Sequence, residues 1–518
     1  MSKDKNKRKE IFDWQIGLDK NKYILSIDQG TTGSRAFIFD QTGKAISSAY
    51  QEFKQYYPKP GWVEHDADEI WQSCVTVIKK AIQKAKISGL DIVAIGITNQ
   101  RETTVLWDRK TSKPICRAIV WQCRRTADIC EKLKAGTYRN TPLENIFHKK
   151  TGLVLDPYFS GTKIKWCLDN IRGLRLKSEA GKICFGTIDS WLIWKLTGGQ
   201  SHTTDMTNAS RTLLFNIKTK KWDKEILEIL GIPKSILPKV QNSGSIFGWT
   251  KGGIITGLPD GLPIMAVMGD QQAALYGHGC YGSGQIKNTY GTGSFLVFNT
   301  GKKLIYSKQG LLTTVSCDVN GNPIYALEGS IFITGAVVQW MRDELKIIKD
   351  SADSEKIIQN LEDSGGVYFV PAFTGLGAPY WNSRSRGLIC GLTRGSGQKH
   401  IIRAGLESIA YQTKDVFEIM QKSLRKKIKE IHVDGGACRN NFLMQFQADM
   451  LGCKVVRPKN IELTAQGVAY LAGITIGLWS KKDINQMNKV DKIFKPKMSI
   501  NEIAHLYKGW QDAVKRAL

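Results

Sequence analysis

A short turn near the start of the chain has the composition of a phosphate-binding loop. It reads DQGTTGSR from Asp28 to Arg35 and lies between the apolar runs 23–27 and 36–39. Glycines let backbone N–H groups converge on an anion, hydroxyls add donors, and a lone aspartate can hold Mg²⁺ through its waters. Taken alone, the segment is explained slightly better as an ordinary polar hairpin tip.

The same arrangement recurs in the second half of the chain. A strand-like run at 285–290 precedes the turn 291–294, and 295–298 supplies the return strand. Two phosphate-type hairpins in one chain favour two related half-domains that face one nucleotide. The repeat therefore favours phosphate binding for the first turn as well.

Two polar segments follow runs that are predicted to be buried strands. The run 262–268 leads into Asp270 at the start of a helix, and the run 91–97 leads into Arg101 and Glu102. Ligands gather at the carboxyl ends of strands in open α/β sheets. Asp270 suits either a helix N-cap or a general base, and local sequence favours the N-cap.

Arg101 and Glu102 are adjacent, so they point in different directions from an extended backbone. They suit the grip of different hydroxyls of one polyol, with arginine donating and glutamate accepting. A surface ion pair is the alternative, but the polar run directly after a buried strand favours a ligand loop. The strand–Gly–Gly–helix pattern over 431–451 similarly suits a nucleoside, although a tight turn explains it equally well.

Other chemically suggestive residues have simpler interpretations. The segments 119–125 and 156–163 combine aromatic rings with donors, and core packing or loop chemistry is their default interpretation. Cys123 is predicted to be a small polarizable filler and not a nucleophile. His65 is expected to be an isolated surface histidine.

The elements that position these residues alternate between strands and helices. The pattern predicts strands over 23–50, a helix over 68–85 and strands at 91–97 and 262–268. A glycine-rich stretch at 276–284 marks the domain boundary, because it ends a helix and suits a hinge. We expect a basic, disordered tail at 1–21, an N-terminal domain at 22–280 and a C-terminal domain at 281–518.

Composition narrows the function classes. The chain has 74 basic and 47 acidic residues, a net charge of +27, but the lysines are spread out and specific nucleic-acid binding is not expected. No apolar run reaches the roughly 18 residues that span a bilayer, and the charged N-terminus lacks a secretory signal. The 11 scattered cysteines suggest reduced thiols, so we expect a cytoplasmic protein without membrane insertion.

These segments together resemble the glycerol kinases of the FGGY carbohydrate-kinase family, from about residue 22 to 517. The resemblance rests on long motifs: Asp28–Thr32, Pro58–Asp66, Ile97–Thr103, Trp121–Arg125, Asp156–Lys163, Gly269–Ala274, Asn288–Gly293, Pro371–Trp381 and Asp434–Ala437. It implies an α/β fold of two ribonuclease-H-like domains of the actin/hexokinase/Hsp70 type, with ATP in an interdomain cleft.

The resemblance also implies residue roles for glycerol phosphorylation. The hydroxyls of glycerol would be bound by Arg101, Glu102, Tyr158, Asp270 and Gln271. The carbon chain would be enclosed by Trp121 and Phe295. Asp270 would be the general base, and Asp28 would position Mg²⁺.

The nucleotide roles follow in the same way. The phosphates would be lined by Thr32, Gly33, Ser34, Arg35, Gly291 and Thr292. The nucleoside would be held by Gly335, Gln339, Gly436 and Asn440. Residue 33 is glycine where many members of the family have serine, so its hydroxyl contact is lost while its backbone N–H remains.

The expected partners are glycerol and ATP, and the expected assembly is a homodimer or homotetramer. Two alternatives stay open at this point: a kinase for another polyol or ketose on the same fold, and a non-catalytic ATPase of the actin/Hsp70 type. The presence of both polyol and phosphate segments favours the glycerol kinase.

Overall fold

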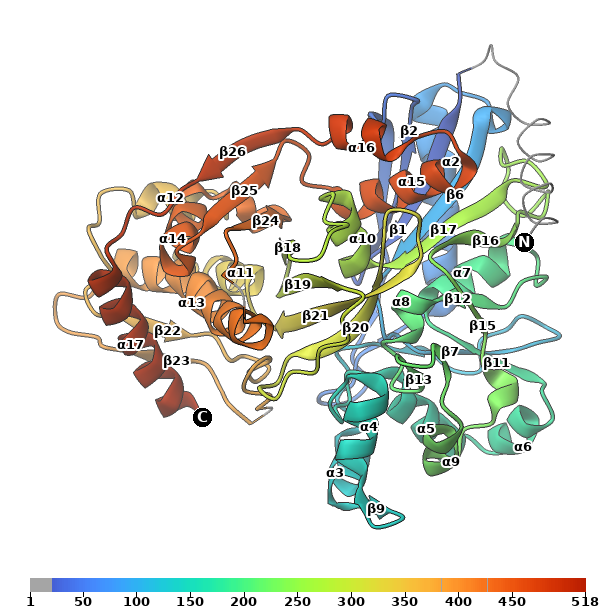
Figure 1. Cartoon of the computed structure of the whole chain (residues 1–518), viewed down its shortest axis with the longest axis horizontal. Coiled ribbons are helices and arrows are strands. Elements are labelled where there is room, and N and C mark those ends of the chain that lie inside the picture. The colour runs from blue at the N-terminus through green and yellow to red at the C-terminus, as the bar shows by residue number, and fades with distance from the viewer. Residues whose placement is uncertain (1–20, 383, 426) are drawn as a thin grey trace. The chain divides into compact units, whose positions relative to one another are not determined.

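The computed structural model describes residues 21–382, 384–425 and 427–518 (Figure 1). Apart from its last position, the predicted tail at 1–21 lies outside these residues. The described chain forms two compact units. Unit 1 runs to Tyr281 and also contains Thr314–Tyr325 and Leu463–Met487, and unit 2 contains Gly282–Thr313, Ala326–Glu462 and Asn488–Leu518. Because both units are discontinuous, the limits 22–280 and 281–518 stay a prediction.

Unit 1 is built on a mixed six-stranded sheet. Its strands, in spatial order, are β16 (Gly244–Trp249), β17 (Pro263–Gly269), β6 (Ile92–Asn99), β1 (Tyr23–Gln29), β2 (Gly33–Phe39) and β3 (Ala45–Glu52). The three central strands β17, β6 and β1 are parallel, and the hairpin β1–β2 is antiparallel, as is the pair β2–β3. The hairpin predicted around the Asp28–Arg35 turn is therefore confirmed.

Both faces of this sheet are buried. Successive residues of a strand point to opposite faces, and β1 accordingly sends Leu25 and Ile27 to one core and Ile24 to another. The first core holds α2 (Ala67–Ala85) and α7 (Ile188–Leu196). The second holds α10 (Asp270–Gly277) and α15 (Leu463–Ile476), the red helix that packs on β1, β6 and β17 in Figure 1.

A close backbone contact joins α10 to α15. A Cβ added to Gly467 would lie 1.9 Å from the carbonyl oxygen of Ala273. Only glycine allows this approach, which explains why residue 467 is a glycine although it lies inside a helix. No helix among the described residues is both long and apolar enough to cross a membrane.

The remaining unit 1 elements are short and lie between β3 and β17 or after α15. They are β4 (Gln55–Tyr56), β5 (Glu64–His65), η1 (Gly89–Asp91), β7 (Val105–Asp108), β8 (Ala118–Ile119), α3 (Ala127–Ala135), β9 (Thr137–Tyr138), β10 (Thr141–Pro142), α4 (Leu143–Thr151), α5 (Ser160–Asn170), α6 (Leu174–Glu179), β11 (Ile183–Gly186), β12 (Thr203–Asp205), α8 (Met206–Ala209), β13 (Phe215–Asn216), β14 (Lys221–Trp222), α9 (Lys224–Leu230), η2 (Lys234–Ile236), β15 (Lys239–Gln241) and α16 (Lys481–Met487).

The second sheet has seven strands and repeats the strand pattern of the first. In spatial order they are β20 (Leu312–Cys317), β21 (Pro323–Ile331), β19 (Ser294–Gly301), β18 (Ile286–Tyr290), β24 (Glu430–Asp434), β25 (Lys454–Pro458) and β26 (Val490–Phe494). The hairpin β18–β19 is antiparallel, β18–β24 and β24–β25 are parallel, and β25–β26 is antiparallel. This order of pairings matches β1–β2, β1–β6, β6–β17 and β17–β16, which confirms two related half-domains.

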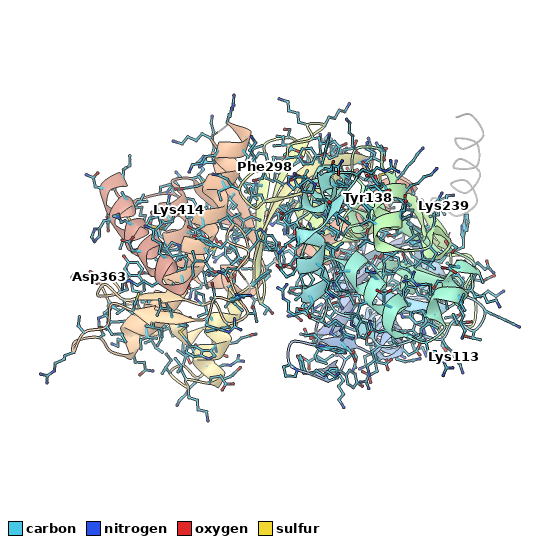
Figure 2. The ribbon with its side chains drawn as sticks, turned by 90° about the horizontal axis from the view of Figure 1, so that it is seen from below. Lys113, Tyr138, Lys239, Phe298, Asp363 and Lys414 are labelled. Atoms are coloured by element: carbon cyan, nitrogen blue, oxygen red, sulfur yellow. The ribbon has the colours of Figure 1, made fainter. Side chains whose placement is uncertain are left out.

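Helices cover the unit 2 strands around one hydrophobic core. They are α11 (Gly335–Asp343), α12 (Asp353–Ile357), α13 (Gln398–Leu424), η3 (Gly436–Arg439), α14 (Asn441–Leu451) and α17 (Ile500–Ala517), with the small sheet β22 (Tyr368–Val370) and β23 (Leu388–Cys390). Lys414 (Figure 2) ties α13 to α14, because its ammonium donates to the Met450 carbonyl oxygen at 2.9 Å.

Candidate active site

The three parallel strands of unit 1 end at one edge of their sheet. Gln29 of β1 and Gly269 of β17 both pair with Asn99 of β6. Asp28, Arg101 and Asp270 therefore lie within a few residues of the same register position on neighbouring strands. The carboxyl edge brings together three polar segments that are far apart in the sequence.

Arg101 and Asp270 form an ion pair at this edge. The Arg101 Nε lies 3.1 Å from Asp270 Oδ1, and its Nη1 donates to Gln272 Oε1 at 3.2 Å. The Arg101 side chain is buried, whereas that of Asp270 is 30% exposed. The arginine thus holds the carboxylate in place and leaves it accessible to a ligand.

The expected N-cap role of Asp270 is wrong. The N-cap of α10 is Gly269, whose extended backbone ends β17, and Asp270 is the first residue of the helix. The Asp270 carboxylate accepts the adjacent Gln271 N–H at 2.7 Å and pairs with Arg101. Because Asp270 already belongs to the helix, its carboxylate reaches Arg101 at the strand ends and accepts the N–H of the next residue, which is not the bond of an N-cap.

Glu102 occupies a strained backbone conformation. Its φ is 61°, and the Thr103 N–H donates to the Arg101 carbonyl oxygen at 2.7 Å across it. A positive φ with this bond defines a γ-turn, which costs about 1–3 kcal/mol and is found mainly at functional sites. The Arg101 Nε lies 3.9 Å from Glu102 Oε1, and both side chains are buried, so the surface ion pair considered from the sequence is excluded.

Arg211 positions Glu102 and was not identified from the sequence. Its fully buried guanidinium donates from Nε to Glu102 Oε1 at 2.5 Å. The same guanidinium lies 5.5 Å from the Tyr158 ring centroid and 5.4 Å from that of Phe159. Arg211 therefore links the carboxylate to the aromatic side of the site. The only sequence signal was a polar run after a short helix, which is too weak to single it out.

Lys163 holds the backbone of Glu102 and Tyr158 in place. This buried side chain, on α5, donates from Nζ to the carbonyl oxygens of Tyr158 at 2.6 Å and Glu102 at 3.2 Å. The Ser160 hydroxyl also donates to the Glu102 carbonyl oxygen, at 2.9 Å. Burial lowers the pKa of Lys163 to about 7. One face of α5 thus holds the γ-turn and the tyrosine together.

The low pKa of Lys163 predicts a pH-dependent contribution to stability. The unfolded chain keeps this lysine protonated up to about pH 10.4, whereas the folded chain releases the proton from about pH 7. Between these values the unfolded state binds more protons, so the free energy of unfolding rises with pH, by up to about 1.4 kcal/mol per pH unit.

Replacement of Lys163 by methionine should remove this rise, as measured by urea denaturation at pH 7 and pH 9. Lys165→Met is the control, because Lys165 lies on the same helix in a partly exposed pair with Asp169. If the free energy of unfolding depends on pH in the same way in Lys163→Met and Lys165→Met, the low pKa assigned to Lys163 is wrong.

Two aromatic rings line the site beside these polar groups. Trp121 and Tyr158 pack edge to face with ring centroids 5.6 Å apart. The Trp121 indole N–H donates to the Thr31 hydroxyl at 3.0 Å. Since Thr31 belongs to the first phosphate-type turn, this bond connects the aromatic wall to the tip of the β1–β2 hairpin.

The hairpin tip is closed by a bond from the Gly30 N–H to the Gly33 carbonyl oxygen at 2.9 Å. Asp28 and Arg35 face each other across the two strands. The Ser34 hydroxyl points the other way, into the core, where it lies 2.7 Å from the Ser73 hydroxyl. Only the backbone of Ser34 is therefore left for a ligand at the turn, whereas Thr32 is exposed.

The missing side chain of Gly33 makes room for Tyr50. A Cβ at residue 33 would lie 2.5 Å from the Tyr50 ring, and this ring also lies under the Arg35 guanidinium, 5.2 Å away. A serine here would push the tyrosine aside. The glycine thus lets an exposed ring pack on the hairpin.

His65 is buried, so the expected surface histidine is wrong. Its Nε2 lies 2.6 Å from Gln55 Oε1, and its Nδ1 lies 3.4 Å from Gln100 Nε2. Burial lowers the pKa of His65 to about 3, which keeps the ring neutral. His65 braces the loops beside the hairpin, because Gln100 also donates to the Gly30 carbonyl oxygen at 3.2 Å.

The second phosphate-type turn, in unit 2, is braced by a helix. The N–H groups of Gly335 and Ala336, at the start of α11, donate to the carbonyl oxygens of Gly291 at 3.0 Å and Thr292 at 3.1 Å. A Cβ at residue 335 would lie 2.6 Å from the Gly291 oxygen, so the contact requires glycine. The structure places Gly291, Thr292 and Gly335 together.

The end of β24 provides a second glycine pair in unit 2. Gly435 has φ 87°, and a Cβ there would lie 2.3 Å from the Tyr290 carbonyl oxygen. No atom lies within 4 Å of a Cβ at the exposed Gly436, which leaves open space for a flat ring. Asn440 caps α14 by accepting the Leu443 N–H at 2.9 Å.

Unit 2 also contains two residues that the family resemblance assigns to ligand binding, one for the nucleoside and one for the carbon chain of glycerol. Gln339 is an exposed residue of α11, and Phe295 lies half-buried in β19, next to the second turn. Their roles in ligand binding stay predictions.

Magnesium is the metal that the phosphate-type turn implies. Within the described ranges no group of three or more histidine, cysteine, aspartate or glutamate residues could hold a metal ion. A magnesium ion in a phosphate site is usually held by one or two carboxylates together with waters and phosphate oxygens. The half-buried Asp28 at the end of β1 fits that donor set.

The chain matches two models of protein domains. The N-terminal domain of the FGGY family of carbohydrate kinases matches residues 23–277, and its C-terminal domain matches residues 286–476. Among curated relatives, glycerol kinase 2 from Thermotoga maritima is 56% identical over 96% of this chain and 99% of the relative. A glycerol kinase from Haemophilus influenzae is 54% identical over 96% of this chain and 98% of the relative.

Solved structures agree with these matches. Glycerol kinase from Plasmodium falciparum, solved with ADP, is 37% identical, with a TM-score of 0.88 over 96% of this chain and 98% of that chain. Gluconate kinase from Lactobacillus acidophilus shares the fold at 24% identity and a TM-score of 0.84. These likenesses confirm the predicted fold class of two ribonuclease-H-like domains of the actin/hexokinase/Hsp70 type. With both domain models matched along most of its length, the chain belongs to the FGGY family of carbohydrate kinases.

Proposed function

We propose that this chain is a glycerol kinase, which transfers the γ-phosphoryl group of ATP to a terminal hydroxyl of glycerol and forms sn-glycerol 3-phosphate. The observation that carries the proposal is the cluster of Arg101, Glu102 and Asp270 beside the Trp121–Tyr158 wall, bonded to the phosphate-type hairpin through Thr31. Curated relatives that are 54–57% identical over almost the whole chain are named glycerol kinase, which supports the choice of substrate.

The polyol roles follow from the chemistry of the cluster. Arg101 has only donors and Glu102 only acceptors, so together they suit two neighbouring hydroxyls of one small polyol. The Tyr158 hydroxyl and the Gln271 amide would complete the polar contacts. The Trp121 ring would cover the carbon chain, and Phe295 of unit 2 is proposed for the same role.

Asp270 is proposed as the general base. As the terminal hydroxyl attacks the γ-phosphorus in line, the Asp270 carboxylate accepts the hydroxyl proton. The ion pair with Arg101 supports the ionised carboxylate that this step requires. Phosphoryl transfer depends mainly on aligning the attacking hydroxyl with the γ-phosphorus and on stabilising the charge of the phosphoryl oxygens. The ion pair between Asp270 and Arg101 holds the proposed base in position for this alignment.

The phosphates are assigned to the two hairpin turns. In unit 1, Thr32, Arg35 and the N–H groups of Gly33 and Ser34 would hold the phosphate oxygens. In unit 2, Gly291 and Thr292 would contact the phosphates, and the nucleoside is assigned to the following group: Gly335, Gln339, Gly436 and Asn440. Asp28 would hold Mg²⁺, which when bound offsets the negative charge of the phosphates.

Release of ADP from a panel of acceptors tests the proposed function. We expect glycerol to give a far higher kcat/KM than dihydroxyacetone, ribulose, xylulose or gluconate. The donors of Arg101 and the acceptors of Glu102 suit neighbouring hydroxyls of glycerol, and curated relatives at 54–57% identity are named glycerol kinase. A preference for a pentulose or for gluconate would overturn the choice of glycerol.

Location and assembly are also proposals. We propose a cytoplasmic protein, because all eleven cysteines are unbridged thiols, as is typical of reducing compartments. The homodimer or homotetramer rests on the family resemblance alone, and light scattering of the purified chain measures its molar mass in solution.

Nucleic-acid binding is expected to be weak and non-specific. Retention of the protein on a polyphosphate resin should therefore be weak and should be lost when salt is added.

A further inference from the structure

The first phosphate-type turn offers few side-chain hydroxyls of its own to a ligand. Residue 33 is glycine, and the Ser34 hydroxyl lies 2.7 Å from the Ser73 hydroxyl inside the core. The Thr31 hydroxyl accepts the Trp121 indole N–H at 3.0 Å. Within residues 31–34, Thr32 is the exposed one. A second exposed hydroxyl for a phosphate would therefore have to come from another element.

Tyr50, on the neighbouring strand β3, brings a hydroxyl to the turn. A Cβ on Gly33 would lie 2.5 Å from the Tyr50 ring and 2.7 Å from the Tyr50 hydroxyl oxygen. The hydroxyl of a serine is attached directly to Cβ, so the tyrosine hydroxyl reaches the region in which a serine at residue 33 would present its own. Tyr50 is 45% exposed, so its ring is not sealed into the core.

The register of the sheet puts Tyr50 on the same face as the charged residues of the turn. Arg35 is paired directly with Tyr50 of β3 and directly with Asp28 of β1. Side chains of directly paired residues lie on one face of a sheet, and residues two apart along a strand share a face as well. Ile24 and Phe37, which share this face, pack with α10 and α15. The tyrosine thus lies on the face that carries the proposed general base.

The contacts of Tyr50 hold its ring but leave its hydroxyl able to change partner. The Arg35 guanidinium lies 5.2 Å from the ring centroid, in a cation–π contact at the side of the turn. The hydroxyl donates to Oε1 of the exposed Glu52 at 3.4 Å, which is long for a hydrogen bond between oxygens. A bond of ordinary length to an ionised phosphate oxygen is stronger, so a bound phosphate would take the hydroxyl from Glu52.

We propose that the Tyr50 hydroxyl is a phosphate-binding group, which donates to a phosphate oxygen of ATP at the first turn in place of a hydroxyl from residue 33. The proposal rests on the proposed function, because it requires the nucleotide phosphates at this turn. Gly33 then has a positive role: it makes room for a tyrosine from β3 that supplies the missing donor. The Arg35 guanidinium would bind the same phosphates and keep the ring in place.

Removal of the hydroxyl alone tests this role. Tyr50→Phe keeps the ring and its contacts with Gly33 and Arg35, so a purely structural role predicts no change. We expect the dissociation constant of a non-hydrolysable ATP analogue with Mg²⁺ to rise on the order of tenfold, as for the loss of one hydrogen bond to a charged group. Calorimetric titration of the full-length protein measures it. Tyr57→Phe changes another exposed tyrosine of unit 1 and should match the wild type.

A double variant moves the hydroxyl back to residue 33. Tyr50→Ala removes the ring and should weaken binding of the analogue at least as much as Tyr50→Phe. The space that the ring leaves can then hold a serine side chain at residue 33. Adding Gly33→Ser to Tyr50→Ala should therefore recover most of the lost affinity. The KM for glycerol at saturating ATP should stay unchanged in Tyr50→Phe and in the double variant, because the proposed polyol contacts do not include Tyr50.

Three results would overturn the proposal. The first is an equal dissociation constant of the analogue for the wild type and Tyr50→Phe. The second is a double variant that binds the analogue no more tightly than Tyr50→Ala. The third is a KM for glycerol that rises in Tyr50→Phe as much as the dissociation constant of the analogue. Failure of the proposed function would appear separately, in the wild type, as no glycerol-dependent release of ADP.

Discussion

Replacement of Asp270 by asparagine is expected to lower kcat by at least about a hundredfold, since a positioned general base typically contributes that much or more. Asparagine keeps the size of the side chain and its place at the first turn of α10, but it cannot accept the hydroxyl proton. The Arg101 ion pair becomes a neutral hydrogen bond, so the pocket keeps its shape. Steady-state ADP release at saturating glycerol measures the effect.

The same variant should bind ATP as tightly as the wild type, because the nucleotide is assigned to the hairpin turns. Calorimetric titration with a non-hydrolysable ATP analogue checks this point. Asp169→Asn is the matched control, because this exposed aspartate pairs with Arg175 at the surface of α5 and should keep full turnover. Near wild-type turnover in Asp270→Asn would refute the base assignment.

The second large effect is expected at Arg211. Methionine at this position leaves the buried Glu102 carboxylate without the guanidinium that lies 2.5 Å from it. Breaking a buried ion pair by removing one partner costs about 3–5 kcal/mol of stability. The KM for glycerol should also rise at least tenfold, because Glu102 and Tyr158 both lose a group that positions them.

Arg211→Lys and Arg175→Met make this test specific. Lysine keeps the charge but not the planar fork, so Arg211→Lys should recover most of the stability and only part of the KM. Arg175 pairs with Asp169 at 2.6 Å on the surface, and its loss should cost less than about 1 kcal/mol. Urea denaturation followed by tryptophan fluorescence reports stability. If Arg211→Met and Arg175→Met were equally stable, with equal KM values, Arg211 would have no positioning role.

Local signals predicted the strands and turns that carry the site. The β1–β2 hairpin and the run from β17 into α10 follow from apolar runs broken by glycine and polar residues, which are properties of neighbouring positions. The parallel pairing of β1, β6 and β17 then places the predicted segments at one edge. The repeated pattern in the second sheet was visible as a second glycine-rich turn.

Contacts between distant segments could not be predicted in the same way. Arg211 and Glu102 are 109 positions apart, and Lys163 and Glu102 are 61 apart. His65 is buried by loops that its own sequence neighbours do not reveal. The return of α15 to unit 1, where the Ala465 carbonyl oxygen accepts the Ser26 hydroxyl across 439 positions, has no local signal at all.

The error at Asp270 has a similar origin. An aspartate before a helix is usually an N-cap, because its carboxylate can accept free amides of the first turn. In this chain Gly269 is the N-cap residue, and the Asp270 carboxylate pairs with Arg101, which follows the neighbouring strand β6. A side chain that departs from its local preference to meet a distant partner is what a functional site is expected to show.

Phosphorus-31 NMR of the purified chain with Mg²⁺-ATP and glycerol tests the central claim most directly, because it follows ATP, ADP, free phosphate and phosphate ester in one sample. We predict that ADP and glycerol 3-phosphate appear in equal amounts, with little inorganic phosphate and no ADP formation in the absence of glycerol. ADP that accumulates with inorganic phosphate, whether or not glycerol is present, would contradict the account and would indicate an ATPase on the same fold.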